Sequence, residues 1–279
     1  MSQKTGRLIK RYYLYLLESG LLICSLLFSA CGIVIERDSA PTIPVNVSNI
    51  PDAVPKEEPR SRYGNPKSYV VLGKRYYVLD SSKGFVERGI ASWYGTKFHG
   101  RRTSSGETYD MYAMTAAHKI LPLPTYVEVT NLENYKKVIV KVNDRGPFHE
   151  NRIIDLSYAA ATKLGIIAKG TGLVEIRAID PATYNRSKVI PVKNIPKPGT
   201  GLPQFYIQIG AFSQRVNAEN TRQKASLIGD SLVKISQTAV NGKILYRVRI
   251  GPLASVEYAD KIVGQLDQLG IYDHHIVLD

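Results

Sequence analysis

The sequence predicts a protein that is mainly β plus α+β: a small closed β-barrel, followed by a compact domain whose antiparallel sheet is backed by two helices. Three observations support this prediction. Between residues 86 and 180, short apolar and β-branched runs alternate with turn residues, which is typical of a barrel. Residues 203–279 contain a repeated pattern of a strand followed by a helix. Two segments, 33–65 and 181–202, are rich in Pro and charged residues and have the composition of linkers.

At 279 residues the chain is long enough for two modest domains, and its 44% of apolar residues can form their cores. The net charge is +13, and most of the excess falls in 1–85 and 181–202 rather than in the predicted domains. This distribution favours attraction to anionic lipid headgroups or to an acidic cell-wall polymer. Nucleic acid is the other usual partner of a basic protein. The sequence contains no recognised reader motif, so no nucleic-acid partner is expected.

The N-terminus has the layout of a secretory signal peptide, 1–30, in which basic residues precede a mostly apolar stretch. Small residues stand directly before Cys31, which resembles a bacterial lipobox, where the cysteine thiol is acylated. Of the two cysteines, Cys24 would leave with the signal peptide, so lipidation of Cys31 explains the remaining lone thiol. The alternative is an uncleaved transmembrane anchor. Gly32 stands in place of the Asp that favours inner-membrane retention, which predicts the outer membrane.

A disordered tether is expected at 31–65, because this segment is rich in Pro, Lys, Glu and Ser and shows little periodicity. A lead-in segment at 66–85 follows it, with a small hairpin expected at 69–79. The barrel contains one expected helix, which Ser157 begins as N-cap and Gly165 ends. Its expected strands are 89–94, 125–131, 137–143 and 172–179.

The last segment repeats a strand that ends in glycine and leads into an amphipathic helix. The strand at 205–212 is echoed at 246–253, and helices are expected at 217–228 and 255–269. In the second helix apolar residues recur at three- and four-residue steps, namely Ala259, Ile262, Val263, Leu266 and Leu269. Two β-α-β halves therefore predict a compact sheet with both helices on one side.

The residues most suggestive of chemistry are Asp144 and Arg145, which follow a β-strand-like run and precede an abrupt Gly-Pro turn. A turn at a strand end is where folds tend to expose functional side chains. Glu107 and His118 also lie beside turn residues, so these groups together predict one cleft. From the local sequence alone, Asp144 could equally cap a turn, His118 could be a satisfied interior histidine, and Glu107 could be solvated.

Considered together, these motifs resemble those of the rare lipoprotein A family, the septal ring lytic transglycosylases. The motifs that carry the resemblance are ASWYG (91–95), FHGRRTSSGE (98–107), TAAH (115–118), VTNL (129–132), VNDRGPF (142–148), RIIDLSYAAA (152–161), FYIQIGAF (205–212) and YRVRIGPL (246–253). The resemblance implies a double-psi β-barrel as the catalytic domain at 86–180, a basic Pro-rich linker at 181–202 and a SPOR domain at 203–279. It also implies that the SPOR domain binds glycan strands that lack stem peptides.

The resemblance further implies cleavage of the bond between N-acetylmuramic acid and N-acetylglucosamine, which leaves a 1,6-anhydro end. A carboxylic acid protonates the glycosidic oxygen, and the carboxylate then takes a proton from the sugar's own C6 hydroxyl. No metal or other cofactor is expected. The family's catalytic residues fall on Asp144, His118 and Glu107. Asp144 would need burial or a nearby charge on Glu107 to act as the acid, so Arg145 is expected to point outward or to pair with Asp155.

Substrate contacts are expected on both domains. The candidates in the barrel are Trp93, Tyr94 and Arg145. The two aromatic rings could equally belong to the barrel core. In the SPOR domain the family's strand motif places the contacts on Gln208, Phe212 and Arg249. The alternative for this polar sheet face is a docking surface for protein partners.

Three functions stay open at this point: a lytic transglycosylase, a non-catalytic septal tether, and a glycoside hydrolase with Glu107 and Asp144 as its two carboxylates. The presence of Glu107, His118 and Asp144 together favours the enzyme, because a tether has no chemical need for all three. The expected partners are peptidoglycan, the membrane through lipidated Cys31, and divisome proteins. The expected location is the outer membrane, facing the periplasm and enriched at the division septum.

Overall fold

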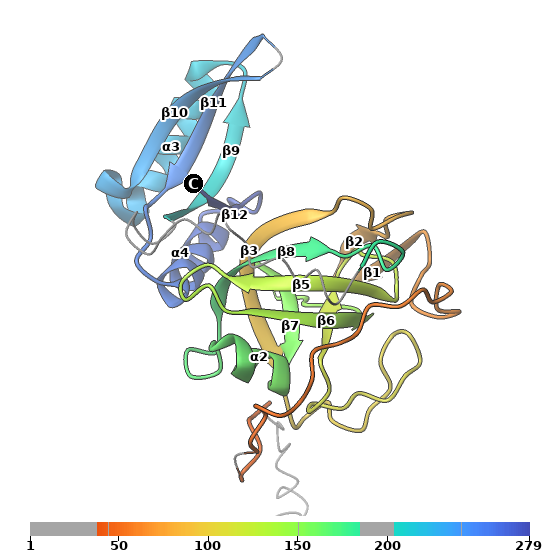
Figure 1. Ribbon diagram of the computed structural model, residues 1–279. Coiled ribbons are helices and arrows are strands. Elements are labelled where there is room, and N and C mark those ends of the chain that lie inside the picture. The colour runs from red at the N-terminus through yellow and green to blue at the C-terminus, as the bar shows by residue number, and fades with distance from the viewer. Residues whose placement is uncertain (1–37, 44, 150, 185–203, 241) are drawn as a thin grey trace, which may run out of the picture. The chain divides into compact units, whose positions relative to one another are not determined.

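The computed structural model describes residues 38–43, 45–149, 151–184, 204–240 and 242–279 (Figure 1). The expected signal peptide, Cys31 and most of the expected linker lie outside these residues. Within the described ranges, no helix combines the length and the apolar character needed to cross a membrane.

Six strands close a β-barrel in the order β3-β7-β4-β6-β5-β8. β3 runs parallel to β7 and β4 parallel to β6, whereas the other neighbouring strands are antiparallel. The strands are β3 (Val86–Tyr94), β4 (Thr115–His118), β5 (Thr125–Asn131), β6 (Lys137–Asp144), β7 (Arg152–Ser157) and β8 (Gly172–Ala178). The predicted fold class is confirmed, but the strand patterns miss β4 and β7. β4 has only four residues, and Asp155 interrupts the apolar run of β7.

Side chains that alternate along the strands fill the barrel. On β6 the buried aliphatic side chains are Val138, Val140 and Val142. Burial of each such aliphatic side chain contributes about 1.5–3 kcal/mol to stability. The lysines that flank these positions, Lys137 and Lys141, are partly exposed. Strand alternation therefore directs Lys141 away from the core and toward the carboxylates described below.

Helix α2 (Tyr158–Leu164) packs against β3, β6 and β7. The Ser157 hydroxyl accepts a hydrogen bond from the backbone nitrogen of Ala160 at 3.2 Å, which caps the first turn. Gly165 ends the helix with a φ of 80°, a conformation that glycine adopts without strain. Both ends of the helix agree with the sequence prediction.

The segment before the barrel runs along the barrel's outer surface in extended form (Figure 1). Two hydrogen bonds to the Asp52 carboxylate join this segment to the barrel domain. Oδ1 of Asp52 accepts from Lys163 Nζ at 2.6 Å, and Oδ2 accepts from the backbone nitrogen of Ile139 at 3.2 Å. Further along, the backbone nitrogen of Ser61 donates to the carbonyl of Leu123 at 2.8 Å. The structure therefore differs from the expectation of a disordered tether over residues 45–65. These contacts use backbone groups and isolated polar side chains, which leave no periodic pattern in the sequence.

A two-stranded hairpin links this segment to the barrel. Its strands, β1 (Ser68–Val71) and β2 (Lys74–Tyr77), pair antiparallel with Ser68 opposite Tyr77. The hairpin expected at 69–79 is thus present. Tyr69 and Tyr76 stack with their ring centroids 5.3 Å apart, and the Phe148 ring meets Tyr69 edge-on at 6.2 Å. The hairpin therefore lies beside the turn that follows β6.

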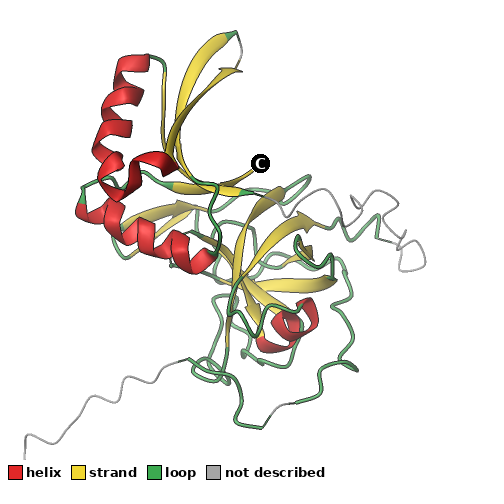
Figure 2. Ribbon diagram, turned by 90° about the vertical axis from the view of Figure 1, so that its left-hand side faces the viewer, coloured by secondary structure: helices red, strands yellow, loops and turns green. Residues whose placement is uncertain are grey.

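The C-terminal domain is a four-stranded antiparallel sheet in the order β10-β11-β9-β12, with both helices on one side (Figure 2). Its elements are β9 (Phe205–Phe212), α3 (Arg215–Gly229), a 3-10 turn η3 (Asp230–Leu232), β10 (Val233–Val240), β11 (Lys243–Ile250), α4 (Val256–Gln268) and β12 (His275–Leu278). The predicted β-α-β halves correspond to β9-α3-β10 and β11-α4-β12. Ile207 and Ile250 of the sheet pack with Ala259, Ile262 and Leu266 of α4 in one core.

Candidate functional site

Asp144 ends β6, and the loop at residues 103–107 holds its carboxylate. Oδ1 of Asp144 accepts three hydrogen bonds: from the backbone nitrogen of Ser104 at 2.7 Å, from the Ser104 hydroxyl at 2.6 Å, and from the backbone nitrogen of Arg145 at 2.7 Å. Within the described chain, Oδ2 makes no hydrogen bond. One oxygen of Asp144 is thus fixed, and the other is left for a ligand.

Glu107 lies on the same loop, and β6 holds its carboxylate. Lys141 Nζ donates to Oε1 at 2.7 Å, and Asn143 Nδ2 donates to Oε2 at 2.7 Å. Partial burial raises the pKa of Glu107, but the bonds to Asn143 and Lys141 together outweigh it, so the pKa is lowered overall. Lys141 also binds Glu58 of the N-terminal segment, at 3.1 Å. The positive charge of Lys141 offsets the negative charge of Glu107. Glu107 is therefore poorly suited to keep a neighbouring carboxyl group protonated, contrary to our expectation.

The Arg145 side chain turns inward, where its guanidinium binds backbone carbonyls. Nε donates to the carbonyl of Gly64 at 2.8 Å, and Nη1 donates to those of Leu121 at 2.6 Å and His118 at 3.1 Å. Nη2 donates to Asn65 Oδ1 at 3.2 Å. Burial lowers the pKa of Arg145 to about 10.

The expectation that Arg145 points outward or pairs with Asp155 is therefore wrong. Its guanidinium has carbonyl acceptors within reach that the sequence does not reveal. No ion pair joins Arg145 to Asp144 in the part of the chain that the structure describes. Arg145 instead ties the N-terminal segment and the loop after β4 to the turn that carries Asp144. It also lies over the Tyr69 ring, with 5.9 Å between the guanidinium carbon and the ring centroid.

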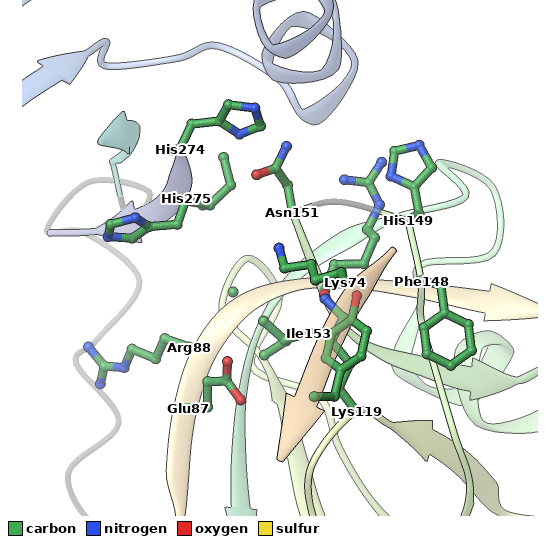
Figure 3. Close-up of a pocket in the computed structure, with 14 residues that line it drawn as sticks. Lys74, Glu87, Arg88, Lys119, Phe148, His149, Asn151, Ile153, His274 and His275 are labelled. Atoms are coloured by element: carbon green, nitrogen blue, oxygen red, sulfur yellow. The ribbon is translucent and has the colours of Figure 1, made fainter. Parts of the chain in front are cut away.

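His118 is only 2% exposed, and protein groups occupy both of its ring nitrogens. Nδ1 accepts from the backbone nitrogens of Ile120 at 3.2 Å and Leu121 at 3.1 Å, so the proton of the neutral ring is assigned to Nε2. Nε2 then donates to Oε2 of Glu87, at 3.2 Å, and Glu87 projects from β3 (Figure 3). Burial lowers the pKa of His118. Among the described residues no hydrogen bond links its ring to Asp144 or Glu107. Asp144 and Glu107 are both held between the loop at 103–107 and the end of β6, whereas the His118 ring is held by Glu87 and by the loop after β4.

Trp93 and Tyr94 project to opposite faces of β3, as neighbours on a strand do. The Trp93 ring is partly buried and meets Tyr158 of α2 edge-on, with ring centroids 6.1 Å apart. The Tyr94 ring is buried and stacks on Tyr109, with centroids 4.0 Å apart. Burial raises the pKa of Tyr94, and the nearby Tyr109 and Asp144 raise it further. Tyr94 therefore belongs to the core beneath the site, whereas Trp93 keeps some exposed surface.

The open face of the C-terminal sheet brings two of its three predicted contact residues together. Arg249 Nε donates to Gln208 Oε1 at 3.3 Å, and the guanidinium lies over the Tyr206 ring at 5.9 Å from its centroid. Arg249 Nη1 also pairs with Asp279, at 2.9 Å. Phe212 lies further along β9, partly buried. Alternation along β9 directs Gln208 and Phe212 away from the helices.

Comparisons with known proteins agree with this architecture. The family model described as lytic transglycolase matches residues 86–176, and the SPOR domain model matches residues 202–277. An endolytic peptidoglycan transglycosylase RlpA from Pseudomonas aeruginosa (strain UCBPP-PA14) is 43% identical over 270 residues, which cover 80% of this chain and 79% of that protein. The protein of the same name from Vibrio cholerae is 42% identical, with 95% of each chain covered. The chain belongs to the RlpA family.

The resemblance to the rare lipoprotein A (RlpA) family is thus confirmed. A solved structure of an RlpA SPOR domain from Pseudomonas aeruginosa is 30% identical and covers 26% of this chain and 96% of its own, with a TM-score of 0.25. The segment before residue 86 lies outside both family models, although its Gly64 and Asn65 bind Arg145 directly.

Several residues of this RlpA-family site escaped the sequence analysis. Ser104 and Asn143 lie inside the quoted motifs, so the Thr-Ser-Ser-Gly turn could have suggested the first as an anchor of Asp144. Asn65 and Glu87 lie outside the quoted motifs. Asp155, expected to anchor an arginine, instead accepts a hydrogen bond from the Ser92 hydroxyl.

Proposed function

We propose that this chain is a lytic transglycosylase that cleaves peptidoglycan glycan strands between N-acetylmuramic acid and N-acetylglucosamine and leaves 1,6-anhydro ends. The observation that carries this proposal is the Asp144 carboxylate, which hydrogen bonds fix at Oδ1 and leave open at Oδ2. Relatives that are 42–43% identical over most of their length are named endolytic peptidoglycan transglycosylases.

The reaction consumes no water, and the protein needs to supply only groups that transfer protons. The bond between C1 of N-acetylmuramic acid and the oxygen of N-acetylglucosamine breaks, and that oxygen gains a proton. The C6 hydroxyl of the same N-acetylmuramic acid loses its proton and bonds to C1. Asp144 is placed to transfer protons at this centre, because a positioned carboxyl group is a suitable general acid or base. Glu107 and His118 act by position: Glu107 holds Asn143 next to Asp144, and His118 holds the loop whose carbonyls bind Arg145.

The C-terminal domain supports a preference for a particular kind of glycan strand. The face with Gln208, Arg249 and Phe212 offers an amide, a cation and an aromatic ring, which suit the hydroxyl and acetamido groups and the apolar faces of sugar rings. We propose that it selects strands lacking stem peptides and so recruits the enzyme to the septum during cell separation. Lipidation of Cys31 would hold the protein on the outer membrane, facing the periplasm, where divisome proteins are candidate partners.

The test is digestion of sacculi that an amidase has stripped of peptides, using protein that lacks residues 1–31. Mass spectrometry of the released fragments should find 1,6-anhydro ends. Asp144→Asn should abolish their release with glycan binding intact, and Asp80→Asn, at an exposed carboxylate, should leave it unchanged. Reducing ends would instead establish a hydrolase with two carboxylates. Bound but uncut glycan would establish a septal tether.

A further inference from the structure

We propose that Asp155 is a second catalytic carboxyl group of the barrel, which protonates the glycosidic oxygen while Asp144 takes the proton from the C6 hydroxyl. The inference rests on the proposed transglycosylase function and assigns the two proton transfers to two different residues. From the local sequence, Asp155 is expected only to anchor an arginine side chain. The placement of the strands argues against a purely structural role of this kind.

The strand register places Asp144 and Asp155 on either side of one small residue. Ala117 on β4 pairs with Asp144 on β6 and, on its other edge, with Asp155 on β7. Ala117 and Asp155 lie directly opposite each other, so their side chains project to the same face of the sheet. The pairing of β4 with β6 shifts register between Ala116 and Ala117, at the end of β6 where Asp144 lies. Neighbouring strands lie about 4.8 Å apart, which puts the two aspartate backbones about 10 Å apart. Pairs of catalytic carboxyl groups that flank a glycosidic bond are about 5–9.5 Å apart.

Two small residues, Ala117 and Gly146, lie beside the Asp155 carboxyl group. A methyl group added at Gly146 would lie 3.8 Å from the Ala117 methyl group and 3.9 Å from Oδ2 of Asp155. These are ordinary van der Waals distances, so there is room for an atom at this point. In the strand register Ala117 lies between Asp144 and Asp155, and a larger side chain at Ala117 or Gly146 would occupy that room.

The buried Tyr94 ring gives an independent indication that both carboxyl groups face one region. Burial is the largest cause of the raised pKa of Tyr94, and Asp144 and Asp155 each add to it. Both carboxylates therefore lie within electrostatic reach of the same hydroxyl. That hydroxyl is buried and makes no hydrogen bond within the described residues.

The surroundings of the two groups suit opposite roles. Asp144 accepts two backbone N–H groups and a hydroxyl on one oxygen, and such bonds stabilise a negative charge. Asp155 is surrounded by protein but keeps part of its surface exposed. Burial raises the pKa of Asp155 against the opposing effects of the Ser92 hydrogen bond and of Arg152, Lys119 and His149. Different environments of this kind are how paired carboxyl groups come to act as acid and base.

The step balances without another reactant. The Asp155 proton moves to the glycosidic oxygen as its bond to C1 breaks, and the N-acetylglucosamine end leaves as an alcohol. The C6 hydroxyl bonds to C1 and gives its proton to Asp144. One proton has moved from Asp155 to Asp144, and exchange with solvent restores both groups.

The test compares Asp155→Asn, Asp144→Asn and the exposed control Asp80→Asn in the full chain, purified in detergent. On amidase-treated sacculi, Asp155→Asn should lower the release of anhydro ends by about 100-fold or more, as loss of a general acid does. Glycan binding and thermal unfolding should stay close to wild type. Wild-type cleavage by Asp155→Asn would overturn the inference but leave the proposed function standing. Failure of the wild-type chain to release anhydro ends would overturn the function itself.

A substrate with an activated leaving group separates a catalytic from a structural role. A muramyl glycoside of 4-nitrophenol needs no protonation of its leaving oxygen, so Asp155→Asn should recover most of its rate on it, whereas Asp144→Asn should not. Recovery by Asp144→Asn instead, or by neither variant, would overturn the assignment. If Asp155→Asn does not fold, Ser92→Ala replaces it. Loss of the Ser92 bond should raise the pKa of Asp155 and shift the alkaline limb of the rate profile to higher pH, and an unmoved limb would overturn the inference.

Discussion

Ser104 donates two hydrogen bonds to one oxygen of Asp144, from its backbone nitrogen at 2.7 Å and from its hydroxyl at 2.6 Å. The hydroxyl also lies 3.2 Å from the backbone nitrogen of Arg145, which donates to it. The loop at 103–107 and the turn after β6 therefore act as one rigid unit. Preorganised donors of this kind are effective because they need no rearrangement during the reaction.

Ser104→Ala should reduce both the cleavage rate and the stability of the folded protein. The backbone bond to Asp144 remains, but a hydroxyl bond to a charged group, worth about 1.5–3 kcal/mol, is lost. We expect the release of anhydro ends to fall about 10-fold or more. Ser104→Thr keeps the hydroxyl and should retain most of the rate. Equal rates for Ser104→Ala and the wild type would show that the hydroxyl does not position Asp144.

Glu107→Gln should change the response of stability to acid. The pKa of Glu107 is lowered in the folded protein, so its contribution is present above about 4.5 and is lost as the pH falls through the folded value. The wild type should therefore exceed Glu107→Gln in stability at pH 7, and the difference should shrink near pH 3.5. Urea unfolding at both pH values measures this. Glu57→Gln, at an exposed glutamate, is the control, and a difference that does not shrink would contradict the prediction.

His118→Gln should make the stability of the protein less dependent on pH between pH 7.5 and 5.5. Burial lowers the pKa of His118 below the 6.5 of the unfolded chain, so its stabilisation is complete above about 6.5 and declines as the pH falls below it. The variant should be about 1–3 kcal/mol less stable at pH 7.5, because it weakens buried hydrogen bonds to Ile120 and Leu121. Its loss of stability between pH 7.5 and 5.5 should be smaller than that of the wild type. A loss as large as that of the wild type would contradict the prediction.

The sequence predicts local features well and long-range partners poorly. The N-cap Ser157 and the C-terminal Gly165 of α2 were predictable, because capping depends on residues within one turn of the helix. The inward side chain of Arg145 was not, since its acceptor Asn65 lies 80 residues away. The partner of His118 is likewise 31 residues away on β3. Family motifs identified Asp144, but only the barrel register places Asp155 opposite it across β4.

Asn65→Ala, in the segment before the barrel, should lower both the stability of the protein and its cleavage rate. Its side chain accepts from the backbone nitrogen of Leu123 at 2.8 Å and from Arg145, and it donates to the carbonyls of Ser61 and Leu123. Loss of these bonds should cost about 1–3 kcal/mol in the free energy of unfolding and reduce the cleavage rate. Asn46→Ala, whose side chain accepts hydrogen bonds from Ser48 within its own turn, should leave both unchanged. Wild-type behaviour of Asn65→Ala would show that Arg145 needs no support from this segment.

Arg249→Ala should lower glycan affinity without changing the chemistry of cleavage. The Arg249 side chain is only 16% exposed, and its guanidinium links Gln208 to Asp279 on this face of the sheet. Its removal takes away a cation and leaves the Gln208 amide without one partner, so we expect binding to peptide-free glycan to weaken about 10-fold, which corresponds to about 1.4 kcal/mol. Lys224→Ala, on the exposed side of α3, is the matched control. Cleavage at saturating glycan should remain at the wild-type rate, and a fall in that rate with unchanged binding would contradict a purely recruiting role for this face.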